Sequence, residues 1–179
     1  MRDPTIARNY AEALFAAGER SGHTLLFGDL MEAVAGAVAV DDRIRTVLET
    51  PRVPKAVKQV VLQKALAGRA PEPFIRFLAA VVRRGRQGLL GLISSQYLAL
   101  VDVKLNRVHA GVTLARTPDD ALVAEIQRRL SAVTGKDVVA HVRTDPRILG
   151  GVIVKIGDRI MDGSVRRKLA ALRRQMLGG

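Results

Sequence analysis

The chain has 179 residues, of which 48% are hydrophobic, 26% charged and 3% aromatic, a composition that indicates a globular protein and excludes a disordered one. It contains no cysteine, which excludes disulfides and thiolate sites, and no stretch approaches the roughly 18 apolar residues of a membrane span. The net charge of +12 would suit an anionic partner, but the excess is shared evenly by residues 1–107 and 108–179, which favours a solvated surface.

The first 107 residues predict six helices, because apolar residues recur three or four positions apart between short links that contain proline or glycine. Thr5 is a candidate N-cap for the first helix, and Pro54 fits the first turn of the fourth. Arg83–Arg86 close the fifth, where the helix dipole favours cations. The apolar stripes that mark the six helices span Ile6–Ala17, Leu26–Ala37, Ile44–Leu48, Val57–Ala65, Phe74–Val81 and Leu90–Leu105.

From Val108 onward the apolar period changes to two, which is typical of half-buried strands. A helix is expected after Pro118, and it ends at Gly135. Gly157-Asp158 supplies a tight turn, and Ser164 can cap a last helix. The predicted strands are Val108–Leu114, Val138–Val142, Val152–Ile156 and Arg159–Met161. The fold class predicted from the sequence is therefore mainly α, with an N-terminal six-helix bundle (1–107) followed by a smaller α+β domain (108–179).

The sequence predicts no catalytic, cofactor or metal site. The three histidines, at 23, 109 and 141, lack convergent ligands, and His109 and His141 alternate with apolar residues on strands, so they are expected on a solvent face. Gly150-Gly151 and Gly157 could suggest a phosphate cradle, but the Gly-x-x-x-x-Gly-Lys-Ser/Thr motif is absent and hairpin geometry explains them. The acidic pairs Asp41-Asp42 and Asp119-Asp120 fall at predicted helix N-termini, where carboxylates are favoured.

The segment from Ile148 to Leu169, ILGGVIVKIGDRIMDGSVRRKL, resembles the C-terminal signature of the ATP synthase delta subunit family, the bacterial counterpart of the oligomycin-sensitivity-conferring protein. The double glycine, the Gly-Asp turn, the Asp-x-Ser cap and the basic helix start occur in the same register. Two weaker motifs agree, Tyr10–Phe15 in the first helix and Phe77–Arg86 in the fifth. The resemblance covers essentially the whole chain.

This resemblance implies a non-catalytic subunit of the F-type proton-translocating ATP synthase, present in one copy and without a cofactor. It would lie at the cytoplasmic face of the bacterial plasma membrane and associate with the membrane only through the complex. Residues 1–107 would bind N-terminal segments of the alpha subunits, and residues 108–179 would bind the b-subunit stalk. The family implies alpha contacts, with ordinary bundle core as the alternative for each, at Tyr10, Ala13, Leu14, Ala17, Ala80, Val81 and Arg84. The signature residues expected to set the fold are Gly150, Gly151, Gly157, Asp158, Asp162, Ser164 and Leu169.

Two other classes of function remain open from the sequence alone. The charge of +12 would suit a nucleic-acid-binding adaptor, whose affinity would fall steeply with salt, but aromatic stacking residues are scarce and no nucleic acid is expected as partner. The glycine-rich segment would suit a small phosphate-handling enzyme, but every catalytic motif of such an enzyme is missing.

Overall fold

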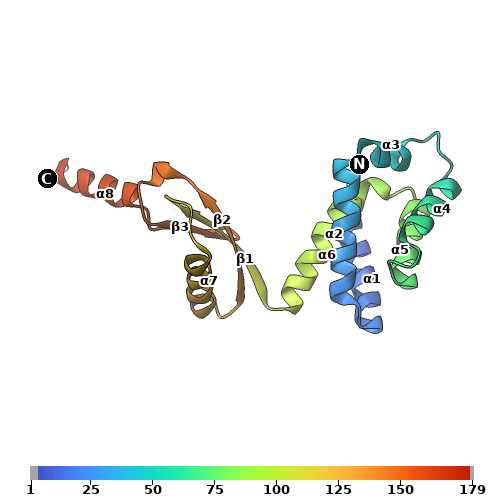
Figure 1. Ribbon diagram of the computed structural model, residues 1–179, viewed down its shortest axis with the longest axis horizontal. Coiled ribbons are helices and arrows are strands. Elements are labelled where there is room, and N and C mark those ends of the chain that lie inside the picture. The colour runs from blue at the N-terminus through green and yellow to red at the C-terminus, as the bar shows by residue number, and fades with distance from the viewer. Residues whose placement is uncertain (1–3, 178–179) are drawn as a thin grey trace. The chain divides into compact units, whose positions relative to one another are not determined.

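The computed structural model describes residues 4–177 and divides into two compact units between Asp102 and Val103 (Figure 1). Helices dominate, and a small four-stranded sheet lies in the second unit, which confirms a mainly helical protein with a minor β part. The dividing point lies inside the last helix of the first unit, a few residues before the change of apolar period at Val108.

The helices of the first unit contain the six apolar stripes found in the sequence. They are α1 (Pro4–Ser21), α2 (Thr24–Val40), α3 (Asp42–Glu49), α4 (Lys55–Leu66), α5 (Glu72–Arg83) and α6 (Leu90–Lys104), with a short 3-10 helix, η1 (Gln87–Leu89), before α6. Thr5 lies within α1 and is not its N-cap, because the helix already includes Pro4. η1 was not predicted, since three residues are too few to show a period.

Aromatic side chains from distant helices meet in the core of the first unit. Phe27 of α2 and Phe74 of α5 are fully buried, with ring centroids 5.5 Å apart. The buried hydroxyl of Tyr97 in α6 donates a hydrogen bond of 2.8 Å to the carbonyl oxygen of Thr24, where α2 begins. Burial, assisted by the nearby Glu19 carboxylate, raises the pKa of Tyr97 well above its ordinary value. The hydroxyl therefore stays protonated and ties α6 to α2.

Helix α4 is attached to its neighbours largely by polar side chains. Its one buried residue is Lys58, whose Nζ donates to the carbonyl oxygens of Leu48 (2.6 Å) and Thr50 (2.8 Å) at the end of α3. Lys55 Nζ donates to the carbonyl oxygen of Arg83 at 3.1 Å, at the end of α5. Cations satisfy the last carbonyls of both helices, where the dipole favours them. The apolar side chains of α4 are thereby left near the surface.

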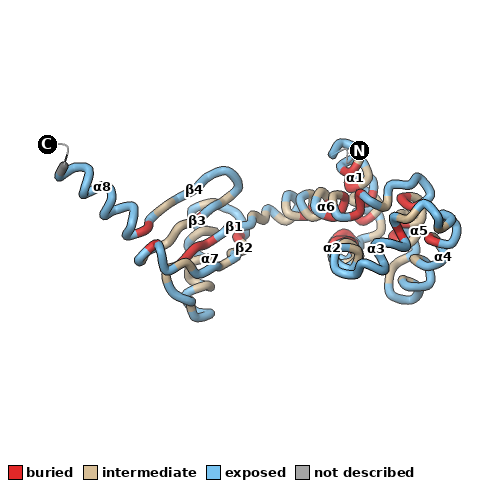
Figure 2. Tube along the Cα trace, turned by 90° about the horizontal axis from the view of Figure 1, so that it is seen from above, coloured by how far each residue is buried: buried red, intermediate tan, exposed pale blue. Residues whose placement is uncertain are grey.

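The second unit is a sheet with a helix packed on one face (Figures 1 and 2). Its elements are β1 (Arg107–Leu114), α7 (Asp120–Thr134), β2 (Asp137–Thr144), the 3-10 helix η2 (Pro146–Ile148), β3 (Val152–Ile156), β4 (Arg159–Asp162) and α8 (Val165–Leu177). The strand order is β2-β1-β3-β4, with β1 parallel to β2 and the other pairs antiparallel. Alternate strand residues, among them Ala110, Val112 and Val154, form a core against Ile126 and Leu130 of α7.

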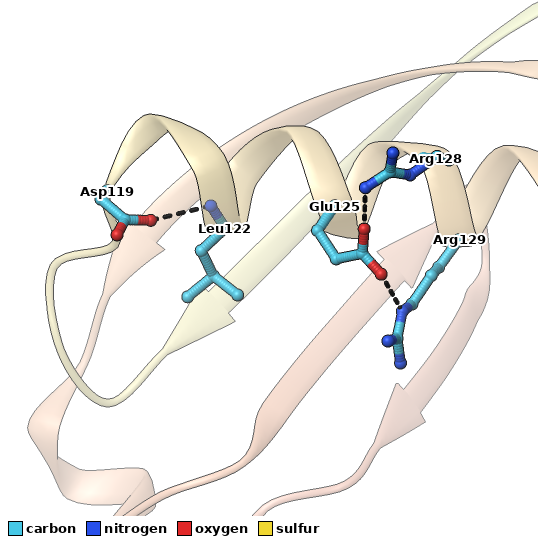
Figure 3. Close-up of polar contacts among 5 residues, drawn as sticks. All are labelled: Asp119, Leu122, Glu125, Arg128 and Arg129. Atoms are coloured by element: carbon cyan, nitrogen blue, oxygen red, sulfur yellow. Dashed lines mark hydrogen bonds and ion pairs between the residues drawn. The ribbon is translucent and has the colours of Figure 1, made fainter.

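Polar side chains cap the start of α7 and pair with one another along its surface (Figure 3). Asp119 Oδ1 accepts a hydrogen bond of 2.8 Å from the Leu122 backbone N–H, as expected of an aspartate at a helix N-cap. One turn later the Glu125 carboxylate is bound by Arg128 and by Arg129, whose Nε lies 2.6 Å from Glu125 Oε1. Gly135 ends the helix with a φ of +66°. The helix in the crossover from β1 to β2 therefore has a defined start and a defined end. Two parallel strands need a crossover connection of this kind.

Candidate partner-binding surfaces

Groups of exposed apolar side chains are the main candidate features among the described residues. Within 4–177, no group of three or more His, Asp or Glu side chains is placed to hold a metal ion. None of the helices in this part of the chain is long and apolar enough to cross a membrane.

Some of the predicted contact residues border a seam between the packed helices α1 and α5. Tyr10 and Phe77 form its floor, with ring centroids 6.2 Å apart in an edge-to-face arrangement at 70°. Ala17 and Ala80 are half-buried, and Ala13 is exposed. Small side chains next to a partly exposed aromatic pair leave a shallow apolar strip, the α1–α5 seam, of the kind that accepts an amphipathic helix.

The seven predicted contact residues do not all lie on this surface. Leu14 and Val81 have no exposed surface and belong to the core, the alternative that the sequence left open. Their side chains face the interior of the first unit and offer nothing to a partner. Arg84 is exposed just after the end of α5. The α1–α5 seam therefore contains fewer residues than the predicted set of contacts.

A second apolar surface in the first unit was not predicted. It is a groove of about 420 Å³ between α2, α3 and α4. Its lining includes Val34 and Val38 of α2, Ile44 of α3, and Val61 and Leu66 of α4. The sequence of α4 contained a sign of this groove. Its apolar residues cover more of the helix than one buried face requires. Lys58 is the buried residue of α4, and Val61 on the same helix remains 47% exposed.

Helix α8 carries an exposed apolar stripe. The predicted stripe residues do fall on one face, but Leu169 and Leu172 are 52% and 54% exposed and Met176 is 84% exposed. The helix leaves the sheet at its first turn and extends away from it (Figures 1 and 2). It contains five cations and no acidic residue. An amphipathic helix of this kind fits an apolar partner surface with acidic flanks.

The glycines of the C-terminal signature lie where two backbone segments cross. Gly151 has a φ of +78°, and a Cβ atom there would lie 2.3 Å from the carbonyl oxygen of Gly163. A Cβ at Gly150 would lie 3.1 Å from Val165 Cγ2. The backbone N–H of Gly163 donates to the Val152 carbonyl at 2.9 Å, and that of Val165 donates to the Gly150 carbonyl at 2.9 Å. Glycine permits this crossing because it has no side chain.

The other signature residues have different surroundings. Asp158 is exposed in the turn between β3 and β4, beside Gly157, whose φ is +55°. Ser164 is fully buried, and its Oγ accepts from the backbone N–H of Arg167 at 3.2 Å, so it caps α8 as expected. Leu169 lies on the exposed stripe of α8. Its placement therefore suits a partner contact better than a role in setting the fold.

The Asp162 carboxylate supports this cap. Its Oδ1 accepts a hydrogen bond of 2.9 Å from the Ser164 backbone N–H. Hydrogen bonds from Ser164, with weaker help from Arg167 and Arg166, lower the pKa of Asp162 below its ordinary value of 3.8. A pKa that is lower in the folded state means that the charged carboxylate stabilises the fold above the ordinary pKa. That stabilisation is lost as the pH falls through the folded pKa.

We therefore expect acid to loosen the start of α8. In the wild-type chain, resistance of the second unit to urea should decline as the pH falls from about 5 to about 2. Asp162→Asn should lower the resistance to urea at neutral pH and make that resistance depend less on pH. The check is the urea concentration at the midpoint of unfolding, measured at a series of pH values through an amide NMR signal of β3. With Ser164→Ala as background, Asp162→Asn should have a smaller effect, whereas identical pH profiles for wild type and Asp162→Asn would contradict the assignment.

The structure brings together two histidines that the sequence placed apart. His109 of β1 and His141 of β2 are exposed, as predicted, on the sheet face opposite α7. Their ring nitrogens Nδ1 and Nε2 lie 2.8 Å apart. The sequence could not show this contact, because it depends on the parallel pairing of two strands separated by α7. His23, the third histidine, lies in the first unit against the Phe27 ring.

Comparisons with known proteins agree along the chain. Residues 6–176 match the family model described as ATP synthase delta (OSCP) subunit. ATP synthase subunit delta of Gemmatimonas aurantiaca is 45% identical over 174 residues, which cover 97% of this chain and 94% of that protein. ATP synthase subunit delta of Chlorobium luteolum is 36% identical, over 98% and 97% of the two chains. A chain of the Toxoplasma gondii mitochondrial ATP synthase hexamer has the same fold, with a TM-score of 0.65 at 19% identity over 96% of this chain and 97% of that one.

Proposed function

This chain belongs to the ATP synthase delta (OSCP) subunit family, and from that membership we propose that it clamps the catalytic head of a rotary ATP synthase to the peripheral stalk. The chain is a non-catalytic subunit of the proton-transporting ATP synthase. The family match over residues 6–176 is the observation that carries the proposal.

The mechanical role follows from how a rotary enzyme works. Proton flow turns the central stalk, and the turning stalk exerts torque on the catalytic head. The head yields useful work only if a second connection holds it still against that torque. We assign this connection to the present chain, in one copy per complex, where it also transmits conformational changes between the proton channel and the head. It reaches the cytoplasmic face of the bacterial plasma membrane through its partners.

The first unit is proposed to bind the head. We assign the six-helix bundle of residues 1–107 to N-terminal segments of the alpha subunits, by docking of an amphipathic helix into the α1–α5 seam. The edge-to-face pair of Tyr10 and Phe77 and the small residues Ala13, Ala17 and Ala80 support this assignment. The aromatic pair offers apolar surface, and the small alanine side chains leave room for the backbone of a docked helix.

The second unit is proposed to bind the b-subunit stalk. The α8 stripe supports this assignment, because exposed leucines on a helix without acidic residues match a helical partner that is apolar with acidic flanks. Burying Leu169 and Leu172 would remove apolar surface from water, which stabilises a complex by about 25 cal/mol per Å² of buried apolar area. The five cations of α8 would speed the encounter and fix its orientation.

We expect Leu172→Asp to weaken binding of the full chain to a b-subunit coiled-coil fragment by at least about tenfold, or 1.4 kcal/mol. The carboxylate would be desolvated within an apolar contact. Ala170→Asp introduces the same charge on an exposed position away from the stripe and should change affinity about twofold at most. Titration calorimetry measures both. Equal losses for the two variants would contradict the assignment of the stripe.

One experiment tests the whole proposal. The folded full chain is used to capture alpha and b subunits separately, with duplex DNA and RNA as competitors. Binding of both subunits that survives nucleic acid supports the clamp. Failure of the folded chain to bind either subunit would overturn it. Salt-sensitive binding of nucleic acid in place of the subunits would favour the adaptor instead.

A further inference from the structure

Two exposed imidazole rings on neighbouring strands form a pair in the second unit. His109 Nδ1 and His141 Nε2 are separated by 2.8 Å, and the ring centroids by 5.0 Å. Since the nitrogens are much closer than the centroids, the rings approach by their edges and share a hydrogen bond. This pair has no part in the seam of the first unit or in the stripe of α8.

The strand register explains why the rings meet. In the parallel pair of β1 and β2, Gly111 lies opposite His141, and His109 lies opposite Val139. The two histidines are therefore diagonal neighbours on the same face, two residues out of step. Gly111 has no side chain to separate them, and α7 covers the other face of the sheet. The backbone thus holds two imidazoles within reach of one ion.

We propose that His109 and His141 form a two-imidazole site for a divalent first-row transition-metal ion of square or octahedral geometry, such as Ni²⁺ or Cu²⁺. Histidine nitrogens bind such ions at about 2.0 Å, so two nitrogens at a right angle lie about 2.8 Å apart. The observed separation already has this value. A tetrahedral ion such as Zn²⁺ needs about 3.3 Å, so the strands would have to adapt further.

Binding needs a small and balanced rearrangement of the pair. Each ring coordinates as a neutral imidazole through a lone pair. One of the two facing nitrogens carries the hydrogen of the shared bond. That proton moves to the far nitrogen of its own ring through solvent, and the ion takes its place without net proton release. Both rings have to turn about their side-chain bonds to aim at the ion, and both side chains are exposed. Water completes the coordination.

The charges on the same sheet face set the strength of the site. Lys155 lies opposite Gly111 on the other side, and Arg143 follows His141 by two residues. Both repel a cation. Arg143 Nε donates to Thr113 Oγ1 at 2.7 Å, which holds this side chain one row away from the pair. Both cations are exposed, so water and salt screen them. The site is expected to bind with moderate affinity and to exchange its ion.

Titration of the tag-free full chain with Ni²⁺ tests the proposal. One equivalent should bind in calorimetry, and the paramagnetic ion should broaden the ring proton NMR signals of His109 and His141 before those of His23. His109→Asn and His141→Asn should each weaken binding at least about tenfold. His23→Asn should leave binding unchanged, because His23 lies in the other unit. Exposed strand positions tolerate these changes, and circular dichroism verifies folding.

Several outcomes would overturn the proposal. Equal broadening of all three histidines, loss of binding in His23→Asn, or undiminished binding in the double variant His109→Asn/His141→Asn would each do so. Tighter binding of Zn²⁺ than of Ni²⁺ at the same site would contradict the assigned geometry. The titration uses no synthase partner, so its result is independent of the proposed clamp.

Discussion

Gly151→Ala is expected to destabilise the second unit by about 3 kcal/mol or more, the largest stability effect of a single methyl group that we anticipate in this chain. The added Cβ would lie 2.3 Å from the carbonyl oxygen of Gly163, far inside van der Waals contact. The obstacle is backbone, so it cannot turn aside as a flexible side chain would. The φ of +78° adds conformational strain for any residue with a Cβ.

Gly157→Ala is the matched control for this effect. Gly157 also has a positive φ, +55°, but a Cβ there would meet nothing within 4 Å. The control therefore carries the conformational cost alone, about 1 kcal/mol. Urea unfolding followed by amide signals of β1 and β3 measures both variants. If Gly151→Ala cost no more than Gly157→Ala, the backbone crossing would not be a tight contact.

The second large effect concerns the α1–α5 seam. Ala17→Lys should weaken binding of an alpha-subunit N-terminal peptide by at least about thirtyfold, or 2 kcal/mol. A lysine at this half-buried position would place its stem over the apolar strip and its charge at the docking site. Fluorescence anisotropy with a labelled peptide measures the loss.

Ala16→Lys is the control for the seam. Ala16 precedes Ala17 in the same helix but lies about 100° further round and is exposed. The two variants have the same composition and net charge, so a general electrostatic effect on the peptide would appear in both. We expect the control to bind within about twofold of wild type. Equal weakening of both variants would remove the seam from the proposed function, while leaving family membership untouched.

The sequence predicted the elements better than it predicted their arrangement. The position of α7 could be inferred locally, because Pro118, the Asp119 cap and the terminal Gly135 are near neighbours in the chain. The parallel pairing of β1 with β2 could not, since the alternating pattern of each strand is compatible with either direction. The approach of His109 to His141 follows only from that pairing.

The seam and the groove show the same limit at the level of side chains. Helical periodicity assigns Leu14 and Ala17 to one stripe, yet the structure buries the first completely and the second only in part. Periodicity gives the direction of a side chain but not the distance at which the next helix packs. In α4 the buried position is taken by Lys58, which no hydrophobic pattern would predict.

In the proposed clamp, one chain carries two binding surfaces, and this changes how firmly the chain is held. The two compact units follow each other directly along the chain, since the division between Asp102 and Val103 lies inside α6. Once one unit has bound its partner in a shared assembly, the other meets its own partner at an effective concentration of the order of millimolar. Each contact can then be individually weak while release of the chain stays rare. A contact that opens briefly under load would close again before the second one opens.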